Sequence, residues 1–393
     1  IAPRGDIFLA LLLSRFLHIE SGCDMEFLNE YATEFEDFYE LTQSIRIKAT
    51  LDAIDVTLGD IGKILGMVKG RRVAIVCGTG IQKYAHGSDV LRAIDGFAAM
   101  LGLFGKEGCG VSYLGDSKLG IESPFYTKAR RVSKVNTDFS KFETVVVQGA
   151  NPLSQMPDSR RVRASMQGVK NLVYFGLYEN ETSAMADLII PAKSFLEKSD
   201  IRTSYSSSVM HVMKQQIESQ IGISEYEFSA RLCNNFNIDI LPQEEYLEHF
   251  KSFGEKNGEG CLHVKSVESI PYREGFDSDD GEFLFLDEFD FSIEKDEKFH
   301  LITPKSVHSL NSQFRRERFV YLHPSMGYKE GEEIELYTNS GSVVLAVKHD
   351  NRLREDSVLI YSGTPGVNNL TTSKHSHEGK CAIYQENKVE IRK

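Results

Sequence analysis

The sequence predicts an α/β chain in which doubly wound, mostly parallel sheets are followed by a small C-terminal β-barrel. Short, wholly apolar runs alternate with helical periods in residues 1–253, as in parallel strands that are buried on both faces. Residues 254–297 are rich in glycine and acidic residues, which indicates a linker or a surface excursion. Residues 298–393 alternate apolar and polar residues with period two, which predicts a separate barrel.

Length and charge exclude several classes of function. A chain of 393 residues is too long for one ordinary core, so we expect two or three domains. The net charge of −12 leaves no basic field to attract nucleic acid, which we exclude as a partner. The longest apolar run, Ile7–Leu13, is far shorter than the roughly 20 residues of a membrane span, so we expect no direct membrane insertion.

The cysteines and the first residues indicate in which cellular compartment the protein is expected. No C-x-x-C pair occurs among the six cysteines, which argues against a disulfide framework and against a local zinc or iron–sulfur site. Reduced thiols in a cytoplasmic protein are the simpler interpretation. The sequence opens at Ile1 and passes directly into an amphipathic helix without a signal peptide, so we interpret the N-terminus as truncated.

The first 200 residues contain alternating helices and strands. Residues 6–70 have helical periodicity and predict two or three packed helices. A buried strand at Arg72–Cys77 then ends in G-T-G, and a helix follows at Ser88–Phe104. Further buried strands are predicted, with a helix near Asp158–Gln167 between the first two: Thr144–Gln148, Leu172–Leu177 and Asp187–Ala192. In such a sheet, ligands bind at the carboxyl ends of the strands.

Several turns at these strand ends offer groups that bind ligands. Gly78 and Gly80 would let backbone amides approach a phosphate or a flat heterocycle, and Gln82 offers a donor and an acceptor to a heterocycle edge. Asn151, in G-A-N-P, is equally well explained as a turn residue. Residues 179–182 offer carboxylates to a guanine or a ribose, although a helix N-cap is an alternative role.

The predicted barrel contributes a second group of polar residues. N-S-G at 339–341 separates two alternating runs and predicts a hairpin turn. Residues 368–371 place two asparagines and a threonine in a loop after the strand S-V-L-I-Y-S-G, where an ordinary polar loop is the alternative. Four histidines are candidate polar contacts to a ligand or proton carriers, although surface or structural roles are simpler: His86, His308, His375 and His377.

Taken in order, these motifs resemble the molybdopterin oxidoreductases of the dimethyl-sulfoxide-reductase type, which include formate dehydrogenases and nitrate reductases. The family's glycine turn with Gln and His is similar to G-T-G-I-Q-K-Y-A-H-G at 78–87. Its G-x-N-P turn is similar to G-A-N-P at 149–152, and a further phrase is similar to A-D-L-I-I-P-A at 186–192. L-I-T-P-K at 301–305 and V-N-N-L-T at 367–371 resemble its dinucleotide-binding barrel, which is of the six-stranded type.

The resemblance implies molybdopterin guanine dinucleotide with Mo or W as the cofactor, and 4Fe–4S clusters held by sequence that would precede residue 1. It implies no catalytic residue or metal ligand within this chain. We expect the strand-end turns and the barrel loops to converge on one cleft. The residues implied to contact the cofactor are Gly78, Thr79, Gly80, Gln82, His86, Gly149, Asn151, Glu179, Glu181, Thr182, Asp187, Thr303, His308, Asn311, Asn368, Asn369 and Thr371.

Two functions fit this resemblance. The segments G-L-Y-E-N-E-T and S-L-N-S-Q-F resemble the large iron–sulfur subunit of NADH-quinone oxidoreductase (complex I) of the Campylobacter and Helicobacter type more than they resemble the catalytic enzymes. That subunit passes electrons from NADH through iron–sulfur clusters to quinone, and this part of it would serve as a scaffold or a cofactor-free interaction module. The alternative is a catalytic Mo or W subunit such as a formate dehydrogenase.

One departure from the catalytic enzymes favours the scaffold. Formate dehydrogenases have E-K-x-G-T-F-x-N where this chain has E-K-S-D-I-R-T-S, so Asp200 and Ile201 replace glycine and threonine. A carboxylate and a β-branched group there put close approach of a cofactor in doubt. In either case we expect other subunits of a respiratory or redox complex as partners. We also expect a cytoplasmic location, peripheral on the inner face of the cell membrane through those partners.

Overall fold

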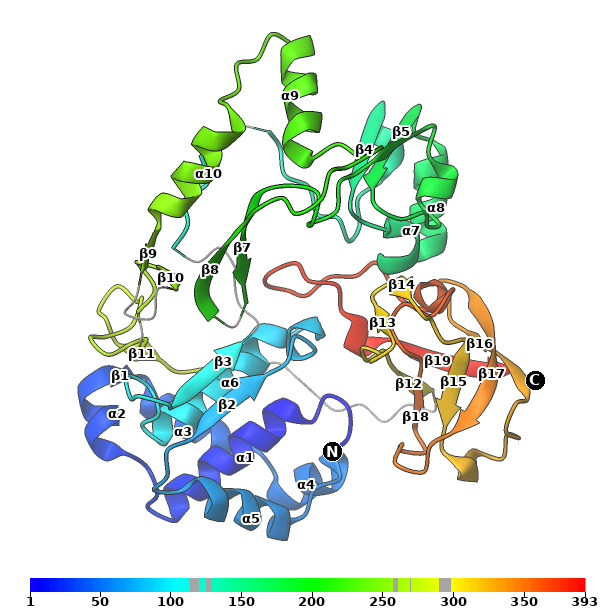
Figure 1. Cartoon of the computed structure of the whole chain (residues 1–393). Helices are drawn as coiled ribbons and strands as arrows, with labels where there is room; N and C mark the ends of the chain where they lie inside the picture. Colours follow the sequence, from blue (N-terminus) through cyan, green and yellow to red (C-terminus); the bar gives the residue numbers. More distant parts are fainter. Residues whose placement is uncertain are drawn as a thin grey trace. The chain divides into compact units, whose positions relative to one another are not determined.

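The computed structural model forms two compact units, one of residues 1–113 with 270–393 and one of residues 114–269 (Figure 1). It describes residues 1–113, 120–124, 129–205, 207–256, 261–268, 270–289 and 298–392. This division differs from the boundaries predicted at 254 and 298, because five residues of the predicted linker segment pack with the N-terminal helices: Phe276, Phe283, Phe285, Leu286 and Phe289.

Five short helices occupy the first part of the first unit, where the periodicity predicts two or three. They are α1 (Asp6–Ile19), α2 (Met25–Tyr31), α3 (Phe35–Ser44), α4 (Ile47–Ile54) and α5 (Leu58–Val68). Capping side chains divide the segment. The Asp24 carboxylate accepts from the Phe27 amide at the start of α2, and Thr57 and Asp60 form a reciprocal capping box at α5.

A pair of parallel strands follows the helices. β2 (Ala74–Cys77) pairs with β3 (Gly110–Tyr113), and α6 (Gly87–Met100) connects them. The parallel pairing confirms the predicted fold class, although β3 lies in a glycine-rich segment for which the sequence predicted no strand. The prediction that this strand is buried on both faces was wrong, because Val76 of β2 is 81% exposed in this two-stranded sheet.

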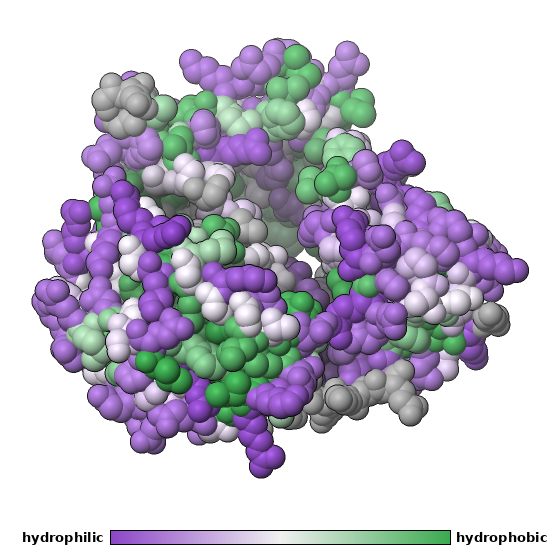
Figure 2. Space-filling view, turned by 90° about the horizontal axis from the view of Figure 1, so that it is seen from below, coloured by the Kyte–Doolittle hydropathy of each residue, from purple (hydrophilic) through white to green (hydrophobic). Residues whose placement is uncertain are grey.

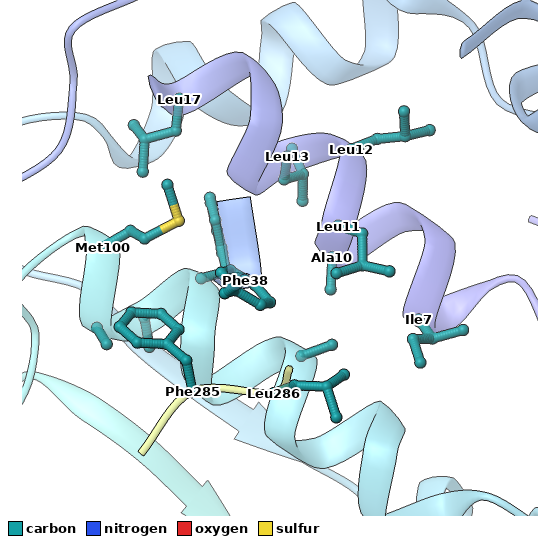
Figure 3. Close-up of a cluster of buried hydrophobic side chains, with 14 of the residues drawn as sticks. Ile7, Ala10, Leu11, Leu12, Leu13, Leu17, Phe38, Met100, Phe285 and Leu286 are labelled. Atoms are coloured by element: carbon teal, nitrogen blue, oxygen red, sulfur yellow. The ribbon is translucent and has the colours of Figure 1, made fainter. Parts of the chain in front are cut away.

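The core of the first unit includes residues from the acidic segment. Figure 3 shows Phe285 and Leu286 facing α1 side chains, with Phe38 of α3 and Met100 of α6 in the same cluster. The rings of Phe38 and Phe285 lie 4.9 Å apart, and β11 (Phe283–Leu284) pairs with β1 (Ala32–Thr33). Residues 283–286 of the predicted linker or surface excursion therefore contribute to a core, although the abundant carboxylates around them suggested exposure to solvent.

The C-terminal strands close into the predicted six-stranded barrel, in the order β12-β18-β15-β17-β16-β19. Their bounds are β12 (Phe299–Ile302), β15 (Phe319–Leu322), β16 (Glu333–Tyr337), β17 (Ser342–His349), β18 (Ser357–Leu359) and β19 (Lys388–Arg392). β16 and β17 form the hairpin expected around residues 339–341. Alternate side chains such as Ile334 and Leu336 fill the interior, which explains the period-two pattern.

The second unit contains a three-stranded parallel sheet, β4 (Thr144–Gln148), β5 (Asn171–Gly176) and β6 (Leu188–Pro191). Helices α7 (Pro152–Gln155) and α8 (Ser159–Gln167) follow β4, and Val162 and Met166 of α8 bury against Leu172. Val146 and Leu188 remain exposed. The predicted strands are therefore confirmed, whereas the prediction that they are buried on both faces was again wrong.

Further elements of the second unit have no counterpart among the predicted ones. An antiparallel sheet has the order β7-β8-β10-β9, and two helices accompany it. The bounds are β7 (Asp200–Ser204), β8 (Ser207–Met213), β9 (Gly254–Lys256), β10 (Leu262–Val264), α9 (Glu225–Asn235) and α10 (Gln243–Ser252). Short polar strands of this kind show no clear alternation, which is why the sequence did not predict them.

Much of the face in Figure 2 is hydrophilic, in keeping with a chain that is 26% charged residues. Among the described residues, no helix has both the length and the apolar character that crossing a bilayer requires.

The buried position of Phe285 gives the first prediction. Phe285→Ala should lower the free energy of unfolding by about 3–5 kcal/mol, because the substitution leaves a cavity between α1, α3 and α6. Phe314→Ala is the matched control, since Phe314 is 72% exposed, and it should cost less than about 0.5 kcal/mol. Urea unfolding followed by circular dichroism measures both. Equal effects of the two substitutions would contradict the assignment of residues 283–286 to the core.

Candidate functional site

The turn after β2 exposes backbone at the predicted cofactor glycines. A Cβ added at Gly78 would meet no atom within 4 Å, so a ligand can approach the main chain there. Neither Gly78 nor Gly80 has a positive φ, and the turn therefore does not require glycine for its conformation. Gly87 differs, because a Cβ there would lie 2.9 Å from the Ile81 carbonyl oxygen. Thr79 is exposed, and Gln82 is half-buried in the short helix η1 (Ile81–Lys83).

This turn is fastened to the last loop of the barrel, within the same unit. The Ala85 amide donates to Glu386 Oε1 at 2.7 Å, and the His377 amide donates to the Ala85 carbonyl at 2.9 Å. The rings of His86 and His377 lie 4.2 Å apart, edge to face, and His86 Nδ1 lies 3.3 Å from Asp89 Oδ2. Sequence reasoning missed Glu386, which is distant in the chain and has no motif around it.

Two half-buried ionisable groups, Asp95 of α6 and Tyr113 of β3, lie near Cys77 of β2. Tyr113 Oη donates to Asp95 Oδ1 at 2.5 Å. Burial raises the pKa of Asp95 to about 6. The hydrogen bond from Tyr113 favours the ionised carboxylate and opposes this rise, but it is the smaller effect. Burial also raises the pKa of the Cys77 thiol, and the negative charge of Asp95 raises it further. Cys77 therefore remains a protonated thiol, which is a weak nucleophile and a weak metal ligand.

The loop after β18 places a second set of predicted residues in the barrel. Thr371 Oγ1 donates to Asn368 at 3.2 Å, and both side chains are buried. Asn369 Nδ2 donates to the Ser342 carbonyl at 3.1 Å. Sequence reasoning also missed Thr364, whose Oγ1 is buried without a hydrogen-bond partner. A buried hydroxyl of this kind is unusual and suits a polar ligand.

The remaining predicted barrel residues lie around a small hairpin of β13 (Ser309–Leu310) and β14 (Gln313–Phe314). Asn311 sits at its tip with a left-handed φ of 54° and accepts from the Lys305 ammonium. Its carbonyl packs so closely on Gly363 that a Cβ there would lie 1.9 Å away. Thr303 is half-buried after β12, whereas His308 is exposed.

In the second unit, the turns after β4 and β5 form one hydrogen-bonded network. Asn151 Nδ2 donates to Glu181 Oε2 at 2.7 Å, and Thr182 Oγ1 donates to Asn151 Oδ1 at 2.8 Å. The Leu153 amide donates to Thr182 Oγ1 at 3.3 Å. Asn151 and Thr182 are buried, so the Asn151 amide fixes the two turns relative to each other.

The other predicted residues of this unit differ in position. Gly149 needs glycine, because its φ is +56°, and the space beside it is open. Glu179 is exposed at the same strand edge. Asp187 accepts from the Leu172 amide at 2.7 Å and so lies at the opposite end of β5, away from this edge. Asn180 Oδ1 accepts from the amides of Thr182 and Ser183, whereas Thr182, the N-cap of the short helix η3 (Ser183–Met185), makes no side-chain cap hydrogen bond.

The predicted residues therefore form groups within each unit. Gln82, His86 and Asn369 belong to the first unit, and Asn151 and Glu181 belong to the second. Their convergence on one cleft stays a prediction. No group of three or more His, Cys, Asp or Glu side chains in the described part of the chain is arranged to hold a metal ion.

Comparison with known proteins identifies related families. The sequence profile of the molybdopterin oxidoreductases matches residues 23–223, and that of the molybdopterin dinucleotide binding domain matches residues 299–387. The chain aligns at 100% coverage with 71% of acetylene hydratase from Pelobacter acetylenicus, with a TM-score of 0.75 and 13% identity. That likeness concerns the fold alone.

Curated relatives are similar over part of their length. The probable oxidoreductase YyaE of Bacillus subtilis (strain 168) is 25% identical over 321 residues, which cover 72% of this chain and 47% of the relative. The trimethylamine-N-oxide reductase of Pasteurella multocida (strain Pm70) is 23% identical over 63% of this chain and 37% of the relative. The F420-dependent formate dehydrogenase subunit alpha of Methanocaldococcus jannaschii is 23% identical over 54% and 38%. The chain thus spans less than half the length of these relatives.

The raised pKa of Asp95 predicts a pH dependence of stability. The unfolded carboxyl titrates near 3.8 and the folded one near 6, so the native state holds an extra proton between these values. Stability from this group is therefore lost as pH rises from about 4 to about 6. Asp95→Asn should gain stability over wild type by about 1–3 kcal/mol across that window. Unfolding at pH 4, 6 and 8 measures the difference, and a difference independent of pH would contradict the prediction.

The network in the second unit predicts a contrast between two threonines of similar burial. Thr182→Val should lower the free energy of unfolding by about 1–3 kcal/mol, because Asn151 Oδ1 and the Leu153 amide lose a partner. Thr364→Val, the matched control, removes a buried hydroxyl that has no partner and should be neutral or stabilising. Chemical denaturation measures both variants. A larger loss at Thr364 than at Thr182 would refute the assigned roles.

Proposed function

Because this chain belongs to the molybdopterin oxidoreductase family, we propose that it holds molybdopterin guanine dinucleotide, carrying Mo or W, in a molybdopterin-dependent oxidoreductase. The observation that carries the proposal is the hydrogen-bonded contact between the glycine turn after β2 and the last loop of the barrel. It keeps predicted cofactor residues from both segments in one compact unit. The relatives named as trimethylamine-N-oxide reductase and formate dehydrogenase support this alternative over a complex I subunit.

The residues of the first unit fit such a cofactor. Open space at Gly78 admits a flat or phosphate-bearing group to the backbone amides, and the half-buried Gln82 offers a donor and an acceptor. In the barrel, the buried Thr364 hydroxyl lacks a protein partner. These are the features that an incoming polar ligand would complete.

The chemistry would be divided between the cofactor and the chain. When bound, the cofactor supplies a metal that exchanges two electrons with a substrate. The amides around Gly78 and the Thr364 hydroxyl would bind and orient the pterin and its pyrophosphate. Glu386, through the Ala85 amide, would fix the glycine turn in position. In the second unit, Asn151 would hold the Glu181 carboxylate at the strand edge, where it can accept from a guanine or a ribose.

One observation favours the scaffold of complex I as a second candidate. Asp200 and Ile201 stand where formate dehydrogenases have glycine and threonine, and in this structure they begin the strand β7. Lys198 beside them forms ion pairs with Asp200 and Glu225, so its charge is already compensated within the protein. Under this candidate the fold is retained for assembly, and electrons pass through clusters elsewhere in the subunit.

Partners and location follow from either candidate as proposals. We propose other subunits of a redox complex as partners and 4Fe–4S clusters in the longer protein. The cytoplasmic, membrane-peripheral location expected from the sequence also stays a prediction.

Metal and pterin analysis of the purified protein that contains this chain tests the proposed function. We expect about one Mo or W and about two pterins per chain, because the family implied by the motifs binds a bis-pterin cofactor. A preparation that oxidises NADH, retains its iron and lacks Mo, W and pterin would overturn the proposal in favour of the scaffold.

The unpartnered Thr364 hydroxyl gives a prediction for the substitution Thr364→Val. The variant should retain the cofactor about tenfold less well, since a hydrogen bond of about 1–1.5 kcal/mol is lost only in the bound state. Its unfolding midpoint without cofactor should not fall. Pterin fluorescence after gel filtration measures retention. Asn369→Ala is a less specific probe, because the Asn369 amide also supports the Ser342 carbonyl. Unchanged retention in Thr364→Val would argue against contact at this loop.

A further inference from the structure

A basic segment precedes β4 on a chain that is otherwise acidic. Residues 129–142 contain four cations and one carboxylate, whereas the whole chain has a net charge of −12. The cations are Arg130, Arg131, Lys134 and Lys141. The net charge, which averages over the chain, conceals this patch.

Three of these cations line a hollow of about 460 Å³ in the second unit. Its other lining residues are polar or exposed apolar side chains. The full lining is Arg130, Arg131, Val132, Ser133, Asn136, Thr137, Asp138, Lys141 and Phe142. None of the residues predicted to contact the molybdopterin cofactor is among them, so the hollow is a separate feature.

Hydrogen bonds from α8 and within the segment hold the wall of the hollow in place. The Arg161 guanidinium of α8 donates to the Val135 carbonyl at 2.8 Å and to the Thr137 carbonyl at 2.9 Å. Val135 is buried, and Thr137 Oγ1 donates to the Ser133 carbonyl. The Asp138 carboxylate accepts from the Ser140 amide at 3.1 Å. The shape of the wall is therefore fixed before any ligand arrives.

Several groups of the hollow are left for a ligand. Ser133 Oγ is buried without a hydrogen-bond partner. Among the ion pairs that the described residues form, none involves Arg130, Arg131 or Lys141. The lining carboxylate, Asp138, is engaged by Ser140, and those hydrogen bonds lower its pKa. The lining of the hollow thus combines an excess of positive charge with a hydroxyl that lacks a hydrogen-bond partner.

We propose that this hollow binds a small molecule that bears a phosphate group. Arg130 and Arg131, which are consecutive in the chain, both line the hollow, and a guanidinium group matches phosphate oxygens in a bidentate manner. Lys141 adds a point charge. The Ser133 hydroxyl donates to a remaining oxygen, while Val132 and Phe142 offer apolar contact to an organic part. The volume lies within the range of about 300–1,000 Å³ that is usual for small-molecule sites.

Calorimetric titration of the purified protein with inorganic pyrophosphate and with adenosine monophosphate tests this proposal. The double variant Arg130→Gln/Arg131→Gln should bind pyrophosphate about tenfold more weakly or worse, because charge-assisted hydrogen bonds are lost. Ser133→Ala should weaken binding about threefold. The matched control is Arg315→Gln/Arg318→Gln, which removes two cations from the first unit, far along the chain from the hollow, and should leave the affinity unchanged.

Three results would overturn the proposal. They are no binding of either probe by the wild type at millimolar concentration, equal weakening in both double variants, and binding of polyglutamate with none of pyrophosphate. The last result would assign the basic segment to an acidic protein partner. Failure of cofactor binding in the metal analysis would leave this test intact, since the two sites share no residue. Circular dichroism of each variant shows whether it is folded.

Discussion

Two hydrogen bonds of the Ala85 main chain join the glycine turn to the barrel: its amide donates to the Glu386 carboxylate, and its carbonyl accepts from the His377 amide. Residues 78–87 and 374–387 are distant in the sequence, and these bonds satisfy both main-chain polar groups of Ala85 at the junction. The rings of His86 and His377 also pack edge to face at this junction. The proposal that the turn and the barrel hold one cofactor depends on this junction, because these hydrogen bonds keep the two segments in contact.

Burial of aromatic side chains provides the rigid support for this junction. Phe285 packs on Phe38 beneath α6, and Arg92 of α6 donates to the Phe285 carbonyl at 2.6 Å. The same helix begins at Gly87, directly after the glycine turn, and contains Asp95. Core, turn and barrel are thus linked through one helix. The second unit uses a different device, a buried amide network around Asn151, to fix its strand-edge turns.

Local sequence pattern predicted the parts of the fold that depend on it alone. Apolar runs indicated the parallel strands, and period-two alternation indicated the barrel, because both patterns reflect burial of one or two faces. Phe283 and Phe285 escaped notice, since carboxylates surround them and burial depends on partners far along the chain. The strand-end rule placed Asn151, Glu181 and Thr182 at neighbouring strand ends, and hydrogen bonds join them in the structure. Asp187, which only the family resemblance implied as a contact, serves the opposite end of β5. Glu386 and Thr364 were beyond sequence reasoning, because their roles arise only from tertiary contact.

Hydrogen–deuterium exchange of the cofactor-loaded and cofactor-stripped protein tests the central claim most directly. The claim is that the glycine turn and the barrel loop hold one ligand together. We expect the amides of residues 78–87 and 361–371 to become protected in the same sample when the cofactor is bound. Protection of one segment without the other, or of neither in a sample that contains stoichiometric Mo or W and pterin, would contradict it.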